Sequence, residues 1–229
     1  MPFKKCYPRS NTRDTDEVMM NRIPTFSETN FKDICDHLGK KDPDLQLILN
    51  NCNYPPMWRR PPSFETLVHI ILEQQVSLAS ALAALNKIKE KMTHITPANL
   101  LTLSNEELRA CYFSRQKITY TRHLAQSFIN NELNIRELDK MDNDAVRSTL
   151  TKIKGIGNWT VDVYLMMVLQ RTDVFPLGDV ALMTSVKETK RLSKDISREA
   201  IAEIASGWKP YQTIAAFILW HSYLCKRKR

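Results

Sequence analysis

Apolar residues recur at helical spacing in nearly every segment after Ser27, and short polar residues suited to helix N-caps separate these segments. The clearest case is FETLVHIILEQQ at residues 64–75, which Ser63 precedes as the expected cap. No window alternates apolar and polar residues as a hairpin strand does, and the chain has only 5 glycines. We therefore expect an all-α fold of roughly ten to twelve helices with short connections.

Two irregular stretches interrupt the helical pattern. Residues 53–63 (NYPPMWRRPPS) contain prolines that block helix continuation, and residues 171–179 (RTDVFPLGD) form a second break. If these breaks bracket one lobe, the segments outside them pack together as the other. We expect a helical bundle of residues 61–177 and a discontinuous lobe of residues 25–60 plus 178–229, with an active-site cleft between the two lobes.

The composition, 43% hydrophobic and 25% charged, is that of an ordinary globular protein, and the net charge of +8 indicates a polyanionic partner without identifying it. Residues 1–24 are expected to form a flexible arm. Met1–Arg22 has no apolar segment of the kind found in a secretory signal, and no apolar run approaches membrane-spanning length. We expect a soluble intracellular protein with no membrane partner, in the cytoplasm or nucleoid of a bacterium or the nucleus of a eukaryote.

The five cysteines are odd in number, dispersed and never arranged as C-x-x-C; they are Cys6, Cys35, Cys52, Cys111 and Cys225. This pattern argues against a disulfide framework and against a structural zinc or iron–sulfur site. The five histidines show no metal-ligand spacing either. We expect reduced thiols in an intracellular protein.

A predicted helix–hairpin–helix spans residues 150–171, with Gly155 and Gly157 in its turn and Ile156 between them as a small apolar plug. The second helix begins with backbone N–H groups that have no intrahelical partner, and such an end suits a phosphate. Two lysines, two glycines and two short polar residues are the candidate phosphate contacts: Lys152, Lys154, Gly155, Gly157, Asn158 and Thr160. The alternative is a plain αα-hairpin with a glycine turn.

Asp179 follows the hairpin by about 20 residues and ends the second break. A carboxylate in a cleft can stabilise an oxocarbenium-like sugar or activate a water, which is the logic of glycoside hydrolysis. The alternative role is an N-cap for the helix that follows, and both roles can hold together. Asp179 is therefore the candidate catalytic residue.

The motifs LTKIKGIGNWTVDVYLMM, FPLGDVAL and RRPPSFETLVHIILEQQVSLASA resemble the helix-hairpin-helix DNA glycosylase superfamily, in order over residues 43–223. The 3-methyladenine DNA glycosylase II branch is the most similar. Bifunctional relatives carry a hairpin lysine that attacks the sugar, and Trp159 stands at that position here. The resemblance therefore implies a monofunctional hydrolase without lyase activity. The family's four-cysteine iron–sulfur tail is missing.

The resemblance also implies where a flipped base would be held. Trp159 and Trp220 stand where alkyladenine relatives place aromatic rings, and tryptophan faces hold an electron-poor methylated purine by stacking and cation–π attraction. Core packing in an apolar helix is an equally good interpretation of Trp220. The family wedge that fills the space of the flipped nucleotide corresponds to Gln74 or Gln75, of which we favour Gln75. A helix–helix turn also explains this pair.

Other positions have weaker assignments. Lys117 either contacts a phosphate or lies on a solvated helix face. In relatives, hairpin carbonyls often hold a monovalent cation, Na⁺ or K⁺, and the oxygens here would be those of Thr151, Ile153 and Ile156. Asp162, on the same helix as Trp159, is a candidate cleft-lining residue and receives no role. Three departures from the family pattern are Glu73 near the wedge, Gln212 in place of a frequent arginine, and Gly178 in place of a frequent second acid.

Together, the residues and the resemblance imply a monomeric, monofunctional DNA glycosylase that flips alkylated purines, such as 3-methyladenine and 7-methylguanine, out of damaged double-stranded DNA and starts base excision repair. A glycosylase for deaminated or oxidised bases and a non-catalytic helix-hairpin-helix DNA-binding protein are the alternatives. The C-terminal KRKR (residues 226–229) is either a frayed basic tail or a nuclear signal.

Overall fold

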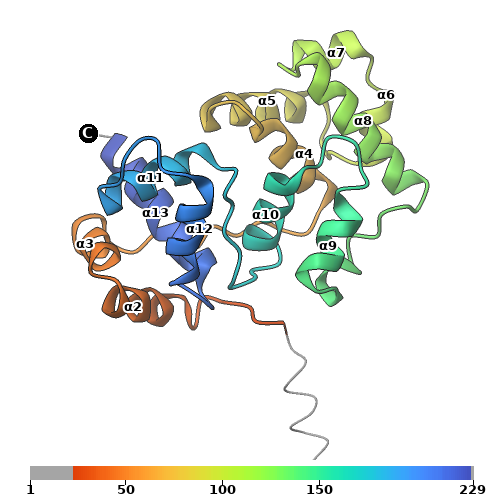
Figure 1. Cartoon of the computed structure of the whole chain (residues 1–229). Helices are drawn as coiled ribbons and strands as arrows, with labels where there is room; N and C mark the ends of the chain where they lie inside the picture. The colour runs from red at the N-terminus through yellow and green to blue at the C-terminus, as the bar shows by residue number, and fades with distance from the viewer. Residues whose placement is uncertain (1–22, 228–229) are drawn as a thin grey trace, which may run out of the picture.

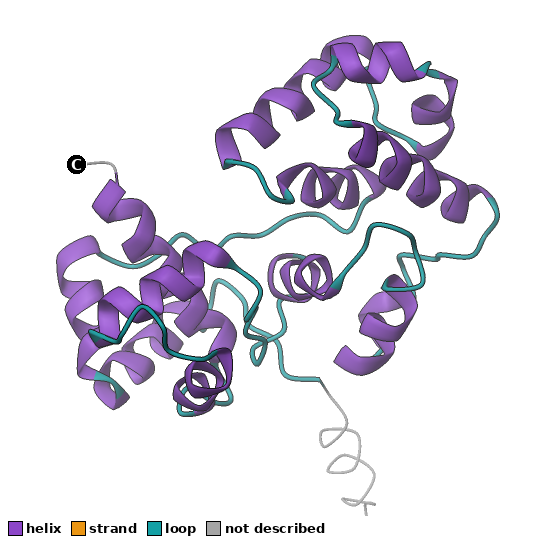
Figure 2. Cartoon of the chain, turned by 45° about the horizontal axis from the view of Figure 1, so that its top comes forward, coloured by secondary structure: helices purple, strands orange, loops and turns teal. Residues whose placement is uncertain are grey.

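The computed structural model describes residues 23–227, which form α-helices and loops with no β-strand (Figure 2). Twelve α-helices and one 3-10 turn, η1 (Leu138–Lys140), lie in this part of the chain. The helices are α2 (Phe31–Lys41), α3 (Pro43–Cys52), α4 (Phe64–Glu73), α5 (Leu78–Lys91), α6 (Pro97–Thr102), α7 (Asn105–Ala110), α8 (Arg115–Ile129), α9 (Asn143–Leu150), α10 (Asn158–Met167), α11 (Val180–Lys190), α12 (Arg198–Ser206) and α13 (Gln212–Arg227). The predicted all-α fold is confirmed.

The helix starts lie where the sequence predicted them, because an N-cap is a local interaction between a side chain and a backbone N–H three residues on. Ser63 accepts from the Thr66 N–H at 3.1 Å and begins α4. Ser104 and Glu107 form the capping box of α7, in which each side chain bonds the other residue's backbone.

The helices pack as two lobes. Helices α2, α3, α11 and α13 pack against one another, and α4 to α8 pack together on the other side of the molecule (Figure 1). Helix α10 packs against α4, and α9 packs against α10. In Figure 1, α10 lies between the two groups, and the segment from α10 to α11 crosses from one group to the other. The exact boundaries, 25–60 plus 178–229 and 61–177, stay a prediction.

Both predicted breaks are irregular in the structure, and both connect the lobes. The N-terminal segment runs along the second break: the Phe26 N–H donates to the Gln170 carbonyl at 3.0 Å, and the Thr172 N–H donates to the Pro24 carbonyl at 3.2 Å. The Phe26 ring is buried edge-on against Phe217 of α13. Of the expected flexible arm at 1–24, residues 1–22 lie outside the described residues.

A buried charge cluster fastens α3 to the C-terminal helices. Asp42, the N-cap of α3, accepts from the Lys190 ammonium at 2.6 and 2.7 Å and from the Trp208 indole N–H at 2.7 Å. Burial acts to raise the pKa of Asp42, but the hydrogen bonds from Lys190 and Trp208 outweigh it and lower that pKa. The residues of this cluster come from α3, from α11 and from the turn after α12, so it joins segments that lie far apart in the sequence.

Candidate active site

The hairpin between α9 and α10 uses its two glycines differently. Gly155 has a φ of +95°, and a methyl group there would overlap the Tyr120 ring, so both backbone and packing require glycine. Gly157 has an extended backbone with φ −101°, and a methyl group there would meet no atom of the described residues within 4 Å. The expectation that the turn has positive φ therefore holds at Gly155 alone. Ile156 is buried between the helices, as predicted.

The beginning of α10 presents a positive surface. Gly157 is its N-cap and supplies no capping side chain, so the first-turn N–H groups of Asn158 and Trp159 have no intrahelical acceptor. Lys152 and Lys154 are both exposed on the preceding turn. Backbone donors, helix dipole and lysines at one end suit a phosphate group.

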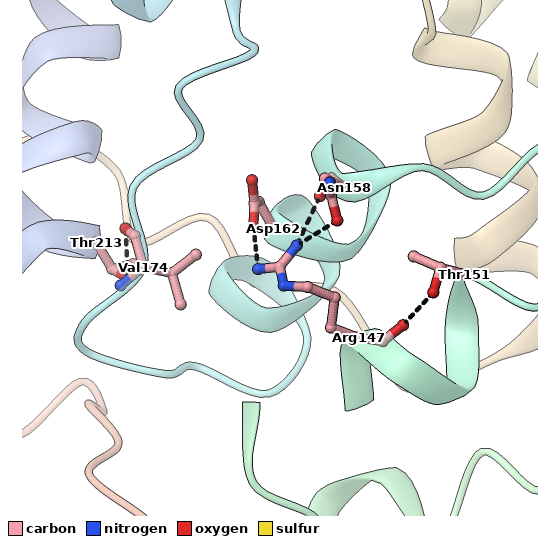
Figure 3. Close-up of polar contacts among 6 residues, drawn as sticks. All are labelled: Arg147, Thr151, Asn158, Asp162, Val174 and Thr213. Carbon is pink, nitrogen blue, oxygen red and sulfur yellow. Dashed lines mark hydrogen bonds and ion pairs between the residues drawn. The ribbon is translucent and has the colours of Figure 1, made fainter. Parts of the chain in front are cut away.

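An ion pair that the sequence did not reveal holds the two hairpin helices together (Figure 3). The Arg147 guanidinium on α9 donates to the Asp162 carboxylate on α10 at 2.6 Å and to the Asn158 side-chain oxygen at 3.1 Å. Burial raises the pKa of Asp162, and the bond from Arg147 opposes that rise. Asn158 and Asp162 therefore brace the hairpin through Arg147.

Gln74 and Thr160 connect the hairpin to the end of α4. The Gln74 amide donates to the Gly155 carbonyl at 2.8 Å and to the Thr160 hydroxyl at 2.9 Å. Thr160 is buried, so its hydroxyl serves this contact within the protein. The phosphate contact expected of the Thr160 side chain gains no support from this geometry.

Gln75 has the opposite environment from Gln74. It is exposed and has a φ of +58°, which turns the chain sharply after the end of α4. Val76 and Leu78 beside it are also exposed, at 44% and 60%. The side chains are therefore divided: Gln74 is fixed internally, and Gln75 is available to a ligand.

Glu73, at the end of α4, departs from the family pattern, and its negative charge is paired with an arginine. Glu73 is buried, and Arg60 from the Pro-rich linker binds it with two nitrogens at 2.7 and 2.8 Å. His69 lies 3.5 Å from the same carboxylate, and burial lowers the pKa of its imidazole. Glu73 therefore fastens the linker to α4 and presents no bare charge to a DNA backbone.

Lys117 is engaged within the protein as well. Its ammonium donates to the Leu72 carbonyl in the last turn of α4, and burial lowers its pKa. A cation at a helix C-terminus is a stabilising arrangement. A phosphate contact by Lys117 stays a prediction.

Asp179 is the N-cap of α11, and three N–H groups converge on its half-buried carboxylate. Its Oδ1 accepts from the Leu182 backbone N–H at 2.7 Å and from the Trp220 indole at 3.0 Å, while Oδ2 accepts from the Trp159 indole at 2.9 Å. An ionised carboxylate has about four lone-pair positions, so one position on Oδ2 remains. Both roles considered for Asp179 are compatible with this geometry.

The two predicted base-pocket tryptophans meet at this carboxylate from different lobes. Trp159 lies in the first turn of α10 and is half-buried. Trp220 of α13 is 9% exposed, lies nearly parallel to Phe217 at 5.9 Å and packs against the edge-on ring of Trp58 at 6.3 Å. Sequence reasoning missed Trp58, because nothing in the proline-rich linker indicated which ring it would contact.

The suggested cation oxygens lie in the hairpin turn, where the Ile153 carbonyl already accepts from the Ile156 N–H at 3.0 Å. That contact leaves one lone pair on Ile153. Within residues 23–227 no group of three or more His, Cys, Asp or Glu side chains is arranged to hold a metal ion. No helix of this same region is long and apolar enough to span a bilayer.

Similar proteins were found by sequence and by structure. The chain is 27% identical over 209 residues to "Alkylbase DNA glycosidase-like protein mag2" of Schizosaccharomyces pombe, covering 88% of this chain and 98% of that protein. It is 30% identical over 175 residues to "DNA-3-methyladenine glycosylase 1" of the same yeast, covering 73% and 76%. The solved structure of an S. pombe 3-methyladenine DNA glycosylase, Mag1, in complex with abasic DNA matches with a TM-score of 0.76 at 28% identity, over 82% of this chain and 95% of that one.

The family assignment follows from a match that covers more than half of the chain and includes the hairpin and Asp179. Residues 68–210 match the model of the HhH-GPD superfamily of base excision DNA repair proteins. The resemblance predicted from the motifs is thereby confirmed. The chain belongs to the HhH-GPD superfamily of base excision DNA repair proteins.

Proposed function

We propose that this protein is a monofunctional DNA glycosylase that hydrolyses the N-glycosidic bond of alkylated purines in duplex DNA. The observation that carries the proposal is the Asp179 carboxylate, which is held by N–H donors from α10, α11 and α13. One of these donors, Trp159, lies in the first turn of α10, where we expect a phosphate to bind. Relatives of this chain named as 3-methyladenine DNA glycosylases support the substrate class.

Each part of the site would have a defined task. The N–H groups at the beginning of α10, with Lys152 and Lys154, would bind the DNA backbone without reading sequence. Gln75 would insert into the duplex in place of the flipped nucleotide, while Gln74 stays bound to the hairpin. The half-exposed ring of Trp159 would contact the extruded base, and a stacking role for Trp220 stays a prediction.

The bond-breaking step needs little acid catalysis, because an alkylated purine already carries positive charge. The electron pair of the N-glycosidic bond leaves with the base, which becomes neutral, and positive charge develops on the deoxyribose. The Asp179 carboxylate stabilises that charge electrostatically. Water then adds to C1′ and loses a proton to solvent. The remaining lone pair of Asp179 Oδ2 is available to orient this water molecule.

Hydrolysis by water rather than through a lysine adduct follows from Trp159. By the resemblance, Trp159 corresponds to the family's attacking lysine, and its indole donates to Asp179. An indole nitrogen forms no Schiff base, so no strand cleavage accompanies base release. Borohydride treatment during the reaction would trap no covalent adduct, and a trapped adduct would contradict a monofunctional enzyme.

The proposal is tested by incubating the protein with methylated duplex DNA and identifying the liberated bases by chromatography. We expect free 3-methyladenine and 7-methylguanine. Release of only hypoxanthine, uracil or an oxidised base from defined duplexes would show that the enzyme acts on deaminated or oxidised bases and not on alkylated purines. Binding to abasic duplex with no release of any base would show that the protein is a non-catalytic DNA-binding protein.

Further expectations concern the setting of the enzyme. We infer that it acts as a monomer in the compartment that holds the genome. A monovalent cation at the Thr151, Ile153 and Ile156 carbonyls would bridge the hairpin to a DNA phosphate. No other cofactor is required for the reaction proposed.

A further inference from the structure

We propose that Trp159 and Trp220 are positioning residues that orient the Asp179 carboxylate through their indole N–H groups, independently of any stacking on the base. This inference rests on the proposed function and assigns a task to the edges of the two rings. The two N–H groups bind different oxygens, Oδ2 and Oδ1, at 2.9 and 3.0 Å. Together they fix the rotation of the carboxylate about its Cβ–Cγ bond.

The surroundings of Trp220 favour this role. Phe217 covers one face of its ring, Trp58 packs against it, and only 9% of the residue is exposed. Such a ring has little surface left for a base, while its N–H donates directly to the carboxylate. The Trp58 and Phe217 rings also pack edge-on against each other, with centroids 5.2 Å apart. These two residues therefore hold Trp220 in the orientation that reaches Asp179.

Trp159 adds a connection between DNA binding and the catalytic carboxylate. It lies in the first turn of α10, so its backbone belongs to the expected phosphate-binding end while its side chain reaches Asp179. A phosphate bound there would steady the same turn that carries the indole. DNA binding at the hairpin would therefore also steady the Asp179 carboxylate, because the same turn carries the indole that holds Oδ2.

The N-cap bond alone does not fix the carboxylate in this way. The Leu182 N–H holds Oδ1 at 2.7 Å, which leaves rotation of Oδ2 to be restrained by Trp159. Orientation matters because electrostatic stabilisation of the sugar cation depends on where the negative oxygen lies relative to C1′.

The test replaces each tryptophan by phenylalanine, which keeps an aromatic face and removes the N–H. For Trp159→Phe and Trp220→Phe we expect the single-turnover rate of 7-methylguanine release to fall about 10-fold each, the size of effect of losing a hydrogen bond to a charged group. Binding to abasic duplex is expected to change by less than about twofold, since the rings remain.

Trp208→Phe is the matched control. Trp208 also donates its indole N–H to an aspartate that caps a helix, Asp42, at 2.7 Å. Its replacement removes the same kind of bond elsewhere in the lobe, so it should lower the melting temperature and leave the release rate within about twofold of wild type. A general loss of stability is thereby separated from an effect on Asp179.

The outcomes are distinguishable. A wild-type protein that releases no base contradicts the proposed function itself. An active wild type whose Trp159→Phe variant keeps the full rate overturns the positioning role, as does a variant that loses only DNA binding. Trp159 is half-buried, so this variant decides the question even where Trp220→Phe fails to fold.

Discussion

At the residue scale, the two hairpin glycines should respond differently to alanine. Gly155→Ala places a side chain at a φ of +95° against the Tyr120 ring, and we expect it to destabilise the fold by about 1–3 kcal/mol or more. Gly157→Ala should fold normally, because a methyl group there meets open space. It should weaken binding to duplex DNA, since that space lies where the phosphate would approach.

Thermal melting and a DNA-binding titration of both variants check this prediction. Equal melting temperatures for the two variants would contradict the distinct roles. The sequence indicated that glycine was needed in this turn, but it did not separate the two positions. The difference depends on Tyr120 of α8, whose approach to Gly155 is set by tertiary packing.

At the element scale, adjacent glutamines at the end of α4 should have separable effects. Gln74→Ala leaves the Gly155 carbonyl and the Thr160 hydroxyl without their donor, and should lower the free energy of unfolding by about 1–3 kcal/mol. Gln75→Ala removes an exposed side chain, so it should leave stability unchanged and slow base release.

Urea unfolding and single-turnover base release, both measured on each variant, show whether Gln74 acts on stability and Gln75 on base release. A Gln75→Ala variant as active as wild type would assign the wedge to another residue. The sequence narrowed the wedge to this pair and favoured Gln75, which the geometry supports. It could not show that Gln74 reaches across to a hairpin 81 residues later in the chain.

Elements whose form depends on local interactions were predicted well. Ser63, Ser104 and Ser114 all cap helices as expected, because the capping bond spans only three residues. The Arg147–Asp162 pair was missed, since its members lie 15 residues apart on two helices and their meeting depends on how the hairpin closes.

At the scale of the whole molecule, the buried cluster at Asp42 predicts a pH dependence of stability. The pKa of this carboxyl is lowered from 3.8 in the folded protein, so its contribution is present above that value and lost as pH falls through the lower, folded pKa. Asp42→Asn should therefore be less stable than wild type at about pH 7, and this difference should shrink towards about pH 3.

Urea unfolding at the two pH values measures the difference, with Asp44→Asn as a control on the same helix. Asp44 also binds Lys190, but its side chain is 40% exposed against 11% for Asp42, so its effect should be smaller. A stability difference for Asp42→Asn that does not change with pH would show that the cluster is not titrating as described.

The two-lobe all-α architecture could be predicted because helical periodicity and the two breaks are visible in the sequence. The Asp42–Lys190–Trp208 cluster could not, since it joins segments up to 166 positions apart. The same holds for the convergence of Trp159 and Trp220. The sequence predicted both residues as aromatic rings that stack on a base, and only the structure shows that both N–H groups bind Asp179.

The most direct test of the central claim measures base release and DNA binding by Asp179→Asn on the same methylated duplex. Asparagine caps a helix as well as aspartate does, so the bond from the Leu182 N–H and the fold should be preserved, while the amide NH2 replaces the oxygen that accepts from Trp159. With the negative charge removed, we predict that release of 7-methylguanine falls at least about 100-fold while abasic-duplex affinity stays within about threefold of wild type. Base release at the wild-type rate by Asp179→Asn would contradict the account.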